Sequence, residues 1–196
     1  MADTFTLREQ HNTTTDQELV ARAIENKQAF TAIVLRYEAP LLRYIIRLGC
    51  KNSSAADDLL QEIFIKTYIH LNEYDPFLQF SSWIYRIAHN EIVSYFRKEK
   101  RRSSVLTRDD LLGLFENITD DAEVVALASE QHTAMEIQAA LDRLEPKYRD
   151  VIVLKFFEEK SYEEISDILL IPQGTVATLI NRAKKKIKIC LEKSYQ

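Results

Sequence analysis

The stretch from Phe80 to Arg102 constrains the fold most, because its apolar residues recur at the interval of an α-helix. With about 3.6 residues per turn, one face carries the apolar residues Phe80, Ile84, Ile87, Ala88, Ile92 and Tyr95. The opposite face carries Ser82, Arg86, Asn90, Arg97 and Arg101, with Trp83 at the border between the two faces. The pattern predicts a buried helix with a basic outer stripe. An indole beside guanidinium groups and an amide suits a phosphate backbone and unpaired bases. A core helix with a solvated basic tail explains this stretch equally well.

The near absence of strand patterns indicates an all-α chain. The 196 residues are 46% hydrophobic, which is enough to fill one large core or two small ones. Only three glycines and four prolines are present, and almost no β-branched run alternates between apolar and polar residues. We therefore expect an all-α fold.

The charged residues are divided into blocks. The net charge of −4 argues against a protein that binds nucleic acid unaided. Residues 84–102 and 179–193 are nevertheless mainly basic, whereas residues 109–130 contain many acidic residues and neither Lys nor Arg. This order predicts two basic helical domains joined by a flexible acidic linker.

Cysteine, glycine and histidine positions argue against several classes of site. Cys50 and Cys190 lie far apart without a CxxC motif, so we expect free, buried thiols rather than a disulfide or a zinc site. The glycines are isolated and the histidines are scattered, so neither a phosphate loop nor a metal cluster is indicated. We expect a protein that is not an enzyme and has no metal, no cofactor and no small-molecule substrate.

The N-terminal sequence does not resemble a targeting or membrane segment. It is polar, and no apolar run in the chain approaches the roughly 20 residues that a membrane span needs. We expect a cytoplasmic protein without membrane insertion, with residues 1–14 disordered.

Three helices are expected before residue 72. The capping-box spacing of Thr15 and Glu18 predicts the start of a first helix. Pro40 is expected to begin a second helix, which ends at Gly49. A third helix is expected over residues 55–71, with Ser53 or Ser54 as its cap. In the third helix Leu59, Leu60, Ile63, Phe64, Thr67 and Tyr68 are predicted to face inward, and Asp57, Asp58, Gln61, Glu62 and Ile65 outward. An exposed isoleucine beside carboxylates is compatible with a docking face, but the pattern alone does not select one.

A loop over residues 72–79 leads into the helix that begins at Phe80. Pro76 is expected to fix a turn in this loop. Phe77 and Leu78 are apolar in what should be a surface segment, so they either fold under the loop or contact a partner.

The last sixty residues predict a helix-turn-helix. Two helices are expected over residues 133–144 and 147–158. A second capping box, at Ser161 and Glu164, predicts the start of a third helix. A turn then leads to a last helix that starts near Pro172. In the last helix Val176, Ile180, Ala183 and Ile187 are predicted to face inward, and Thr175, Thr178, Asn181, Arg182 and Lys185 outward. A reading helix for the major groove is indicated; a plain helical hairpin with a solvated basic tail is the alternative.

These segments together resemble the sigma-70 family of RNA polymerase sigma factors, in its small extracytoplasmic-function (ECF) group. Residues 58–68 are similar to the polymerase-docking helix of the family, residues 80–90 to its promoter-melting segment, and residues 141–146, 161–165 and 172–183 to its region 4. The resemblance implies that residues 15–102 form region 2, residues 103–130 a linker and residues 131–196 region 4.

The resemblance also implies a function and a set of contacts. Core RNA polymerase would bind Asp58, Gln61, Glu62 and Ile65; the minus-ten promoter element would contact Tyr74, Gln79, Trp83, Arg86, Asn90 and Arg97; the minus-35 element would contact Thr175, Thr178, Asn181, Arg182 and Lys185. The loop from Tyr74 to Gln79 matches the one that captures a flipped base. An anti-sigma factor is a further expected partner.

The chain departs from the family at three positions near its end and in the loop over residues 75–79, which carries Asp-Pro-Phe-Leu-Gln where small polar residues are usual. Ala177 and Leu179 replace common basic residues, and Leu170 replaces a frequent turn glycine, which costs on the order of 1 kcal/mol if the site needs a positive φ. A free-standing dimeric helix-turn-helix repressor is the alternative function.

Overall fold

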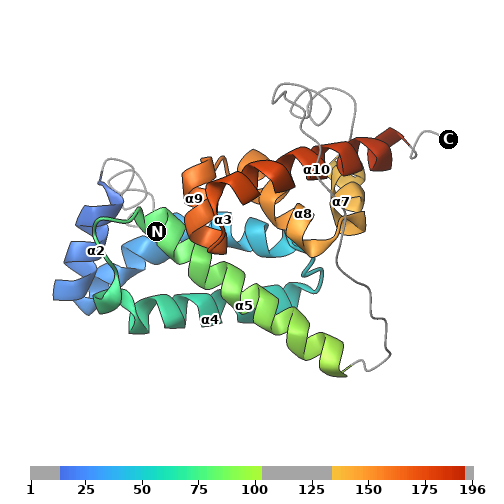
Figure 1. The fold of residues 1–196 in the computed structure, drawn as a ribbon. Coiled ribbons are helices and arrows are strands. Elements are labelled where there is room, and N and C mark those ends of the chain that lie inside the picture. The colour runs from blue at the N-terminus through green and yellow to red at the C-terminus, as the bar shows by residue number, and fades with distance from the viewer. Residues whose placement is uncertain (1–13, 103–133, 193–196) are drawn as a thin grey trace. The chain divides into compact units, whose positions relative to one another are not determined.

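The structure is a computed structural model that describes residues 14–102 and 134–192, and every regular element within these ranges is helical (Figure 1). It divides into two compact units. The first consists of the described residues up to Ile46 together with Cys50–Glu91, and the second of Arg47–Gly49 and the described residues from Ile92 onward. The predicted all-α class is confirmed. The predicted acidic linker and residues 1–13 of the predicted disordered N-terminus lie outside the described residues, whereas Thr14 is described and its carbonyl accepts a hydrogen bond from Arg36. The predicted domain limits stay predictions.

The first two helices of the first unit are separated by a short 3-10 turn. Helix α2 spans Asp16–Glu25, the turn Lys27–Ala29, and helix α3 Phe30–Arg47. The predicted capping box is confirmed, since the Glu18 amide donates to Thr15 Oγ1 at 3.3 Å and the Thr15 amide to Glu18 Oε2 at 3.1 Å.

The predicted helix start at Pro40 is wrong, because Pro40 lies inside α3. A proline removes one backbone hydrogen bond from a helix interior. The buried face of α3 continues across that position, with Ala32, Ile33, Tyr37, Leu41, Tyr44 and Ile45 all buried. Burial of this face outweighs the lost hydrogen bond. Gly49 follows the helix with a φ of 108°, as expected of a C-terminal glycine.

Helix α4 spans Ser53–Ile69, and its cap differs from the prediction. Asn52 is the N-cap, and its Oδ1 accepts a hydrogen bond from the Ala55 amide at 3.1 Å. Leu59, Leu60, Ile63 and Thr67 are buried as predicted, whereas Tyr68 is 38% exposed. The Tyr68 ring contacts Phe30 edge-on, so it covers the rim of the core rather than entering it.

Helix α5 spans Phe80–Arg102, as predicted. Phe80, Ile84, Ala88 and Ile92 are buried as expected, and Tyr85 is buried in addition, while Ile87 and Tyr95 are only partly buried. Ser82 was expected on the outer stripe but is 1% exposed. A helical wheel considers one helix alone, and it therefore cannot show which small polar side chains neighbouring elements cover.

The second unit contains the predicted helix-turn-helix. Helix α7 spans Ala134–Arg143, α8 Pro146–Ile152, a π-helical turn Val153–Phe157, α9 Tyr162–Leu169 and α10 Gln173–Glu192. Helix α10 packs against α7, α8 and α9. Its four predicted inward residues, Val176, Ile180, Ala183 and Ile187, are all buried, and so are Ile165 and Ile168 of α9. The capping box at Ser161 and Glu164 is confirmed.

Two residues at turns of the second unit adopt the left-handed conformation without being glycine. Leu170, the C-cap of α9, has a φ of 56°, and Glu159 has a φ of 53°. The predicted strain at Leu170 therefore exists, and Glu159 adds a second strained position that the sequence did not indicate.

Two further predictions concern the cysteines and membrane-spanning segments. Cys50 is a buried free thiol as predicted, and the side chain of Cys190 lies outside the described residues. Within the described residues, no helix is long and apolar enough to cross a membrane.

Candidate nucleic-acid interface

One face of α4 presents the predicted docking residues. Asp58, Gln61, Glu62 and Ile65 are all exposed, and their spacing places them on one side of the helix. Ile65 is 52% exposed and Ile69, one turn further on, is 61% exposed. Lys66 Nζ lies 3.9 Å from Glu62 Oε1, and 2.6 Å from Glu91 Oε1 of α5. The face therefore combines exposed isoleucines with carboxylates.

The start of α5 contributes to a cluster of four aromatic rings, which we call the aromatic cluster: Tyr37, Tyr74, Phe80 and Trp83. The Phe80 ring lies 5.6 Å from Tyr37, 5.3 Å from Tyr74 and 5.6 Å from Trp83. The Tyr74 and Trp83 ring centroids are 5.5 Å apart. Tyr37, Tyr74 and Phe80 are buried, whereas Trp83 is partly exposed. The Phe80 contacts with Tyr37 and Tyr74 are edge-to-face, and the two contacts of Trp83 are tilted. Rings packed at these distances restrict one another's position.

The loop before α5 is held in one conformation by its own hydrogen bonds. Asp75 Oδ1 accepts from the Phe77 amide at 3.0 Å, and the Asp75 carbonyl accepts from the Leu78 amide at 3.0 Å. The hydroxyl of the buried Tyr74 donates to the Leu78 carbonyl. Pro76 between them restricts the backbone further. The loop is thus a turn fastened to the aromatic cluster through Tyr74.

Phe77 lies at the tip of this turn and is 99% exposed. It is the residue whose position the sequence left open, and it does not fold under the loop. Leu78 is partly buried and Gln79 is exposed. Leaving a Phe side chain in water forgoes the free energy that its burial normally contributes. An aromatic residue in a predicted surface loop is therefore a signal in the sequence that could have placed Phe77 among the candidate contacts.

The outer stripe of α5 borders a hollow of about 280 Å³. Its lining consists of Lys66, His70, Glu73, Trp83, Ile87, Asn90 and Glu91. The Asn90 amide is exposed, and the Lys66 ammonium is paired with Glu91. The structure therefore brings Trp83 and Asn90 together around one hollow. Arg86 is partly buried on the same helix, and Arg97 is exposed further along it.

His89 is next to the outer stripe, and its imidazole contacts Tyr44 of the core. Burial lowers its pKa to about 4, so the imidazole is neutral near pH 7. Its Nδ1 lies 3.2 Å from the Tyr44 hydroxyl. A neutral, partly buried imidazole adds no positive charge to the stripe.

The last helix presents the predicted reading residues with different exposures. Thr175 and Lys185 are exposed, and Thr178, Asn181 and Arg182 are partly buried. The helix N-terminus is closed by the Pro172 carbonyl, which accepts from the Thr175 amide at 2.8 Å. The Thr178 hydroxyl donates to the Gly174 carbonyl at 2.8 Å. Its proton is therefore used inside the helix, and its oxygen lone pairs and methyl group stay available.

Comparisons with known proteins cover both units. Residues 33–102 match the family model described as Sigma-70 region 2, and residues 134–187 match the one described as Sigma-70, region 4. The ECF RNA polymerase sigma factor SigW of Bacillus subtilis is 34% identical over 170 residues, which cover 83% of this chain and 89% of SigW. The RNA polymerase sigma-H factor of Pseudomonas aeruginosa is 32% identical over 186 residues, which cover 90% of this chain and 94% of that protein.

A solved structure agrees in fold. The sigma factor RpoE of Bartonella quintana, crystallised in complex with the anti-sigma factor NepR, matches with a TM-score of 0.65 at 20% identity, covering 83% of this chain and 96% of that chain. The family predicted from the sequence motifs is confirmed by the matches to regions 2 and 4. The chain belongs to the sigma-70 family and is an ECF RNA polymerase sigma factor, a subunit that directs transcription initiation.

Proposed function

We propose that this sigma factor opens the minus-ten element with the outer stripe of α5. The observation that carries the proposal is that Asn90 and Trp83 border one hollow, with the amide exposed and the indole partly exposed. An amide offers both a donor and an acceptor to a base edge, and an indole stacks on an unpaired base. Arg86 and Arg97, on the same helix, would hold the phosphate backbone.

The loop from Tyr74 to Gln79 is proposed to hold a base that has left the duplex. Unstacking and unpairing a base cost a few kcal/mol, and stacking on an aromatic ring returns about 1–3 kcal/mol. Phe77 presents a fully exposed ring on a turn whose backbone is already fixed. We therefore add Phe77 to the sequence-predicted Tyr74 and Gln79 in this loop, with the buried Tyr74 supporting the turn rather than touching DNA.

Region 4 is proposed to read the minus-35 element as duplex through Thr175, Thr178, Asn181, Arg182 and Lys185. The internal hydrogen bond of Thr178 restricts what this residue can recognise. Its lone pairs can accept from cytosine N4 or adenine N6, and its methyl group can contact a thymine methyl, whereas guanine presents only acceptors in the major groove. Thr178 in this rotamer therefore disfavours guanine.

The α4 face is proposed as the docking site for core RNA polymerase, through Asp58, Gln61, Glu62 and Ile65. Exposed apolar residues rimmed by carboxylates are typical of a protein interface. The RpoE match was crystallised with an anti-sigma factor, and we propose that an anti-sigma factor also regulates this chain. We propose a cytoplasmic location, because a polymerase subunit acts on the chromosome. The comparisons give no support to a free-standing repressor.

Run-off transcription with core polymerase on a promoter library tests the proposal. Asn90→Ala should lower strand opening more than initial promoter binding, because it removes a contact to unpaired bases. Arg182→Ala should weaken the closed complex by about tenfold, as loss of one base or phosphate contact costs about 1–3 kcal/mol. Gln17→Ala removes an exposed amide from α2 and serves as the matched control.

The outcomes separate the proposal from its rivals. Wild-type activity of both Asn90→Ala and Arg182→Ala would reject the site assignments. A wild-type chain that leaves core polymerase unselective, or that binds a palindrome tightly without polymerase, would reject the function itself.

A further inference from the structure

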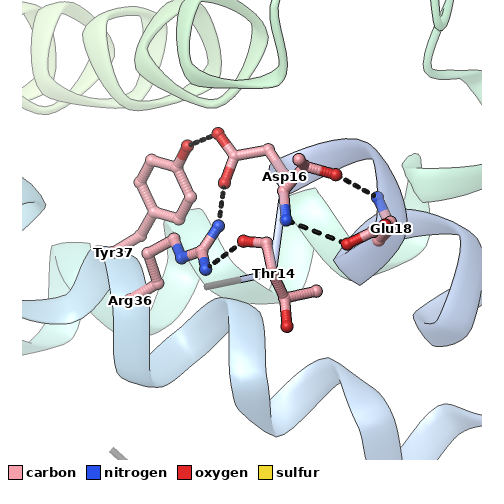
Figure 2. A network of polar contacts seen from close by, with 6 residues as sticks. Thr14, Asp16, Glu18, Arg36 and Tyr37 are labelled. Carbon is pink, nitrogen blue, oxygen red and sulfur yellow. Dashed lines mark hydrogen bonds and ion pairs between the residues drawn. The ribbon is translucent and has the colours of Figure 1, made fainter. Parts of the chain in front are cut away.

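The N-terminus of α2 is held by a network that reaches into α3 (Figure 2). Arg36 Nη1 donates to Asp16 Oδ1 at 2.6 Å, and Tyr37 Oη donates to Asp16 Oδ2 at 2.6 Å. Arg36 Nη2 also donates to the Thr14 carbonyl at 2.6 Å. Both oxygens of the Asp16 carboxylate are therefore engaged, one of them by a charged donor. Such hydrogen bonds are about twice as strong as neutral ones, so the network fixes the Tyr37 hydroxyl.

Tyr37 connects this network to the aromatic cluster. Its ring meets Phe80 at 5.6 Å with the planes inclined by 76°. Phe80 in turn contacts Tyr74 and Trp83, and the Tyr74 hydroxyl holds the Leu78 carbonyl in the loop. A continuous set of contacts thus runs from the Asp16 carboxylate to the turn that presents Phe77.

The electrostatics agree with this geometry. Burial, followed by the hydrogen bond to Asp16, raises the pKa of Tyr37 far above its ordinary value. The hydroxyl consequently stays protonated and donates at any physiological pH. Burial, followed by the charge of Asp16, also raises the pKa of Tyr74. The carboxylate is therefore close enough to both tyrosines to influence them.

Packing alone does not require this arrangement. A phenylalanine at position 37 would contact Phe80 with the same ring, so the hydroxyl and its carboxylate partner add directional restraint rather than apolar contact. Directional restraint has value where a neighbouring group must be presented at a set position. Here the neighbouring group is the loop before α5.

We propose that Asp16 is a positioning residue for promoter opening, which acts through Tyr37 and the aromatic cluster to set the position of the Trp83 indole and of the Tyr74–Gln79 loop. The inference rests on the proposed function of α5 and this loop. Asp16 itself does not touch DNA. Its effect should appear in opening and not in polymerase binding, because the docking residues lie on α4.

Two variants and one control test this proposal in the full chain. Tyr37→Phe removes the hydroxyl and keeps the ring and the Asp16 to Arg36 ion pair. Asp16→Asn removes the charge and keeps the shape. The control Asn26→Ala removes a capping hydrogen bond, in which Asn26 Oδ1 accepts from the Gln28 amide at 3.0 Å. Asn26 lies at the other end of α2, about 15 Å from Asp16 along the helix. It matches the variants in losing one local polar contact.

The first readout uses the single tryptophan of the chain, Trp83. In the free protein, Tyr37→Phe and Asp16→Asn should change the intensity or the maximum of its emission, and Asn26→Ala should not. The second readout is permanganate reactivity of promoter thymines with core polymerase. Open complex should fall about tenfold or more in the two variants, the effect expected from the loss of one hydrogen bond to a charged group, with polymerase affinity unchanged.

Each other outcome overturns the proposal. Folded variants with wild-type emission and wild-type opening would overturn the role of Asp16 and would leave the proposed function intact. If the two variants lose opening and polymerase affinity to the same extent, and Asn26→Ala shows the same losses, the network contributes to stability alone. If Asp16→Asn does not fold, Tyr37→Phe decides. If the wild-type holoenzyme opens no promoter, the proposed function fails, and this inference fails with it.

Discussion

Replacing Glu159 by glycine should stabilise the second unit. Glu159 has a φ of 53°, and its side chain is exposed. The left-handed conformation costs a non-glycine residue about 1–2 kcal/mol. Glycine makes the unfolded chain more flexible, which offsets about 0.4–1 kcal/mol of that relief. The exposed side chain contributes little apolar packing, so the net gain is about 0.5–1 kcal/mol in the free energy of unfolding.

Leu170 provides the comparison within the same unit. Its φ of 56° is nearly the same, but its side chain is 68% exposed and so about a third of it is removed from water. Full burial of a leucine contributes about 1.5–3 kcal/mol, so removing this part costs roughly 0.5–1 kcal/mol. Leu170→Gly should therefore leave the stability nearly unchanged, even though the strain at both positions is alike.

Thermal unfolding followed by circular dichroism and by tryptophan fluorescence measures both effects. Trp83 belongs to the first unit, so a change in ellipticity without a change in fluorescence reports the second. Glu159→Gly should raise the melting temperature of that transition by about 3–6 °C for a unit of this size. Glu159→Ala keeps the strain and removes the carboxylate. If it stabilises as much as Glu159→Gly, or if Glu159→Gly stabilises nothing, backbone strain is not the cause.

Two further variants test the first unit. The wild-type chain should lose about 2–3 kcal/mol of unfolding free energy between pH 7 and pH 4.5, as measured by urea unfolding, and His89→Gln should not show this loss. The sign follows from burial, which lowers the pKa of His89 from 6.5 to about 4, so its contribution is complete above pH 6.5 and is lost as the pH falls. A wild-type pH dependence in the variant would contradict this reasoning. Phe77→Ala should leave the unfolding free energy within about 0.5 kcal/mol, since Phe77 is 99% exposed, and should reduce permanganate-detected opening about tenfold if the ring stacks on a base. Unchanged opening would exclude stacking.

Local signals explain what the sequence predicted well. The capping boxes at Thr15 and Ser161 depend on residues three positions apart, and both are present. The inward face of α10 repeats at helical intervals, and all four predicted residues are buried. The family motifs, read in order, predicted the sigma-70 membership that the comparisons confirm.

The errors share a different cause. Pro40 was expected to begin a helix because proline disfavours a helix interior, yet the apolar face on both sides of it is buried in one core. Ser82 was placed on the outer stripe by the helical wheel of one element, and it is buried. In both cases burial depends on several elements at once, which a local pattern does not contain.

The link from Asp16 to the loop before α5 belongs to the same class of information. Asp16 lies 21 residues from Tyr37 in sequence, and Phe80 lies further still, so no periodicity or motif connects them. Read alone, Asp16 is an acidic residue in the first turn of a helix, which the helix dipole already explains. Only the bidentate geometry, with one oxygen on Arg36 and the other on Tyr37, distinguishes a restraint on the aromatic cluster from a favourable helix start. A variant that preserves the charge at position 16 but removes the tyrosine hydroxyl separates the two, because the helix dipole depends on the carboxylate and the positioning depends on the hydroxyl it holds.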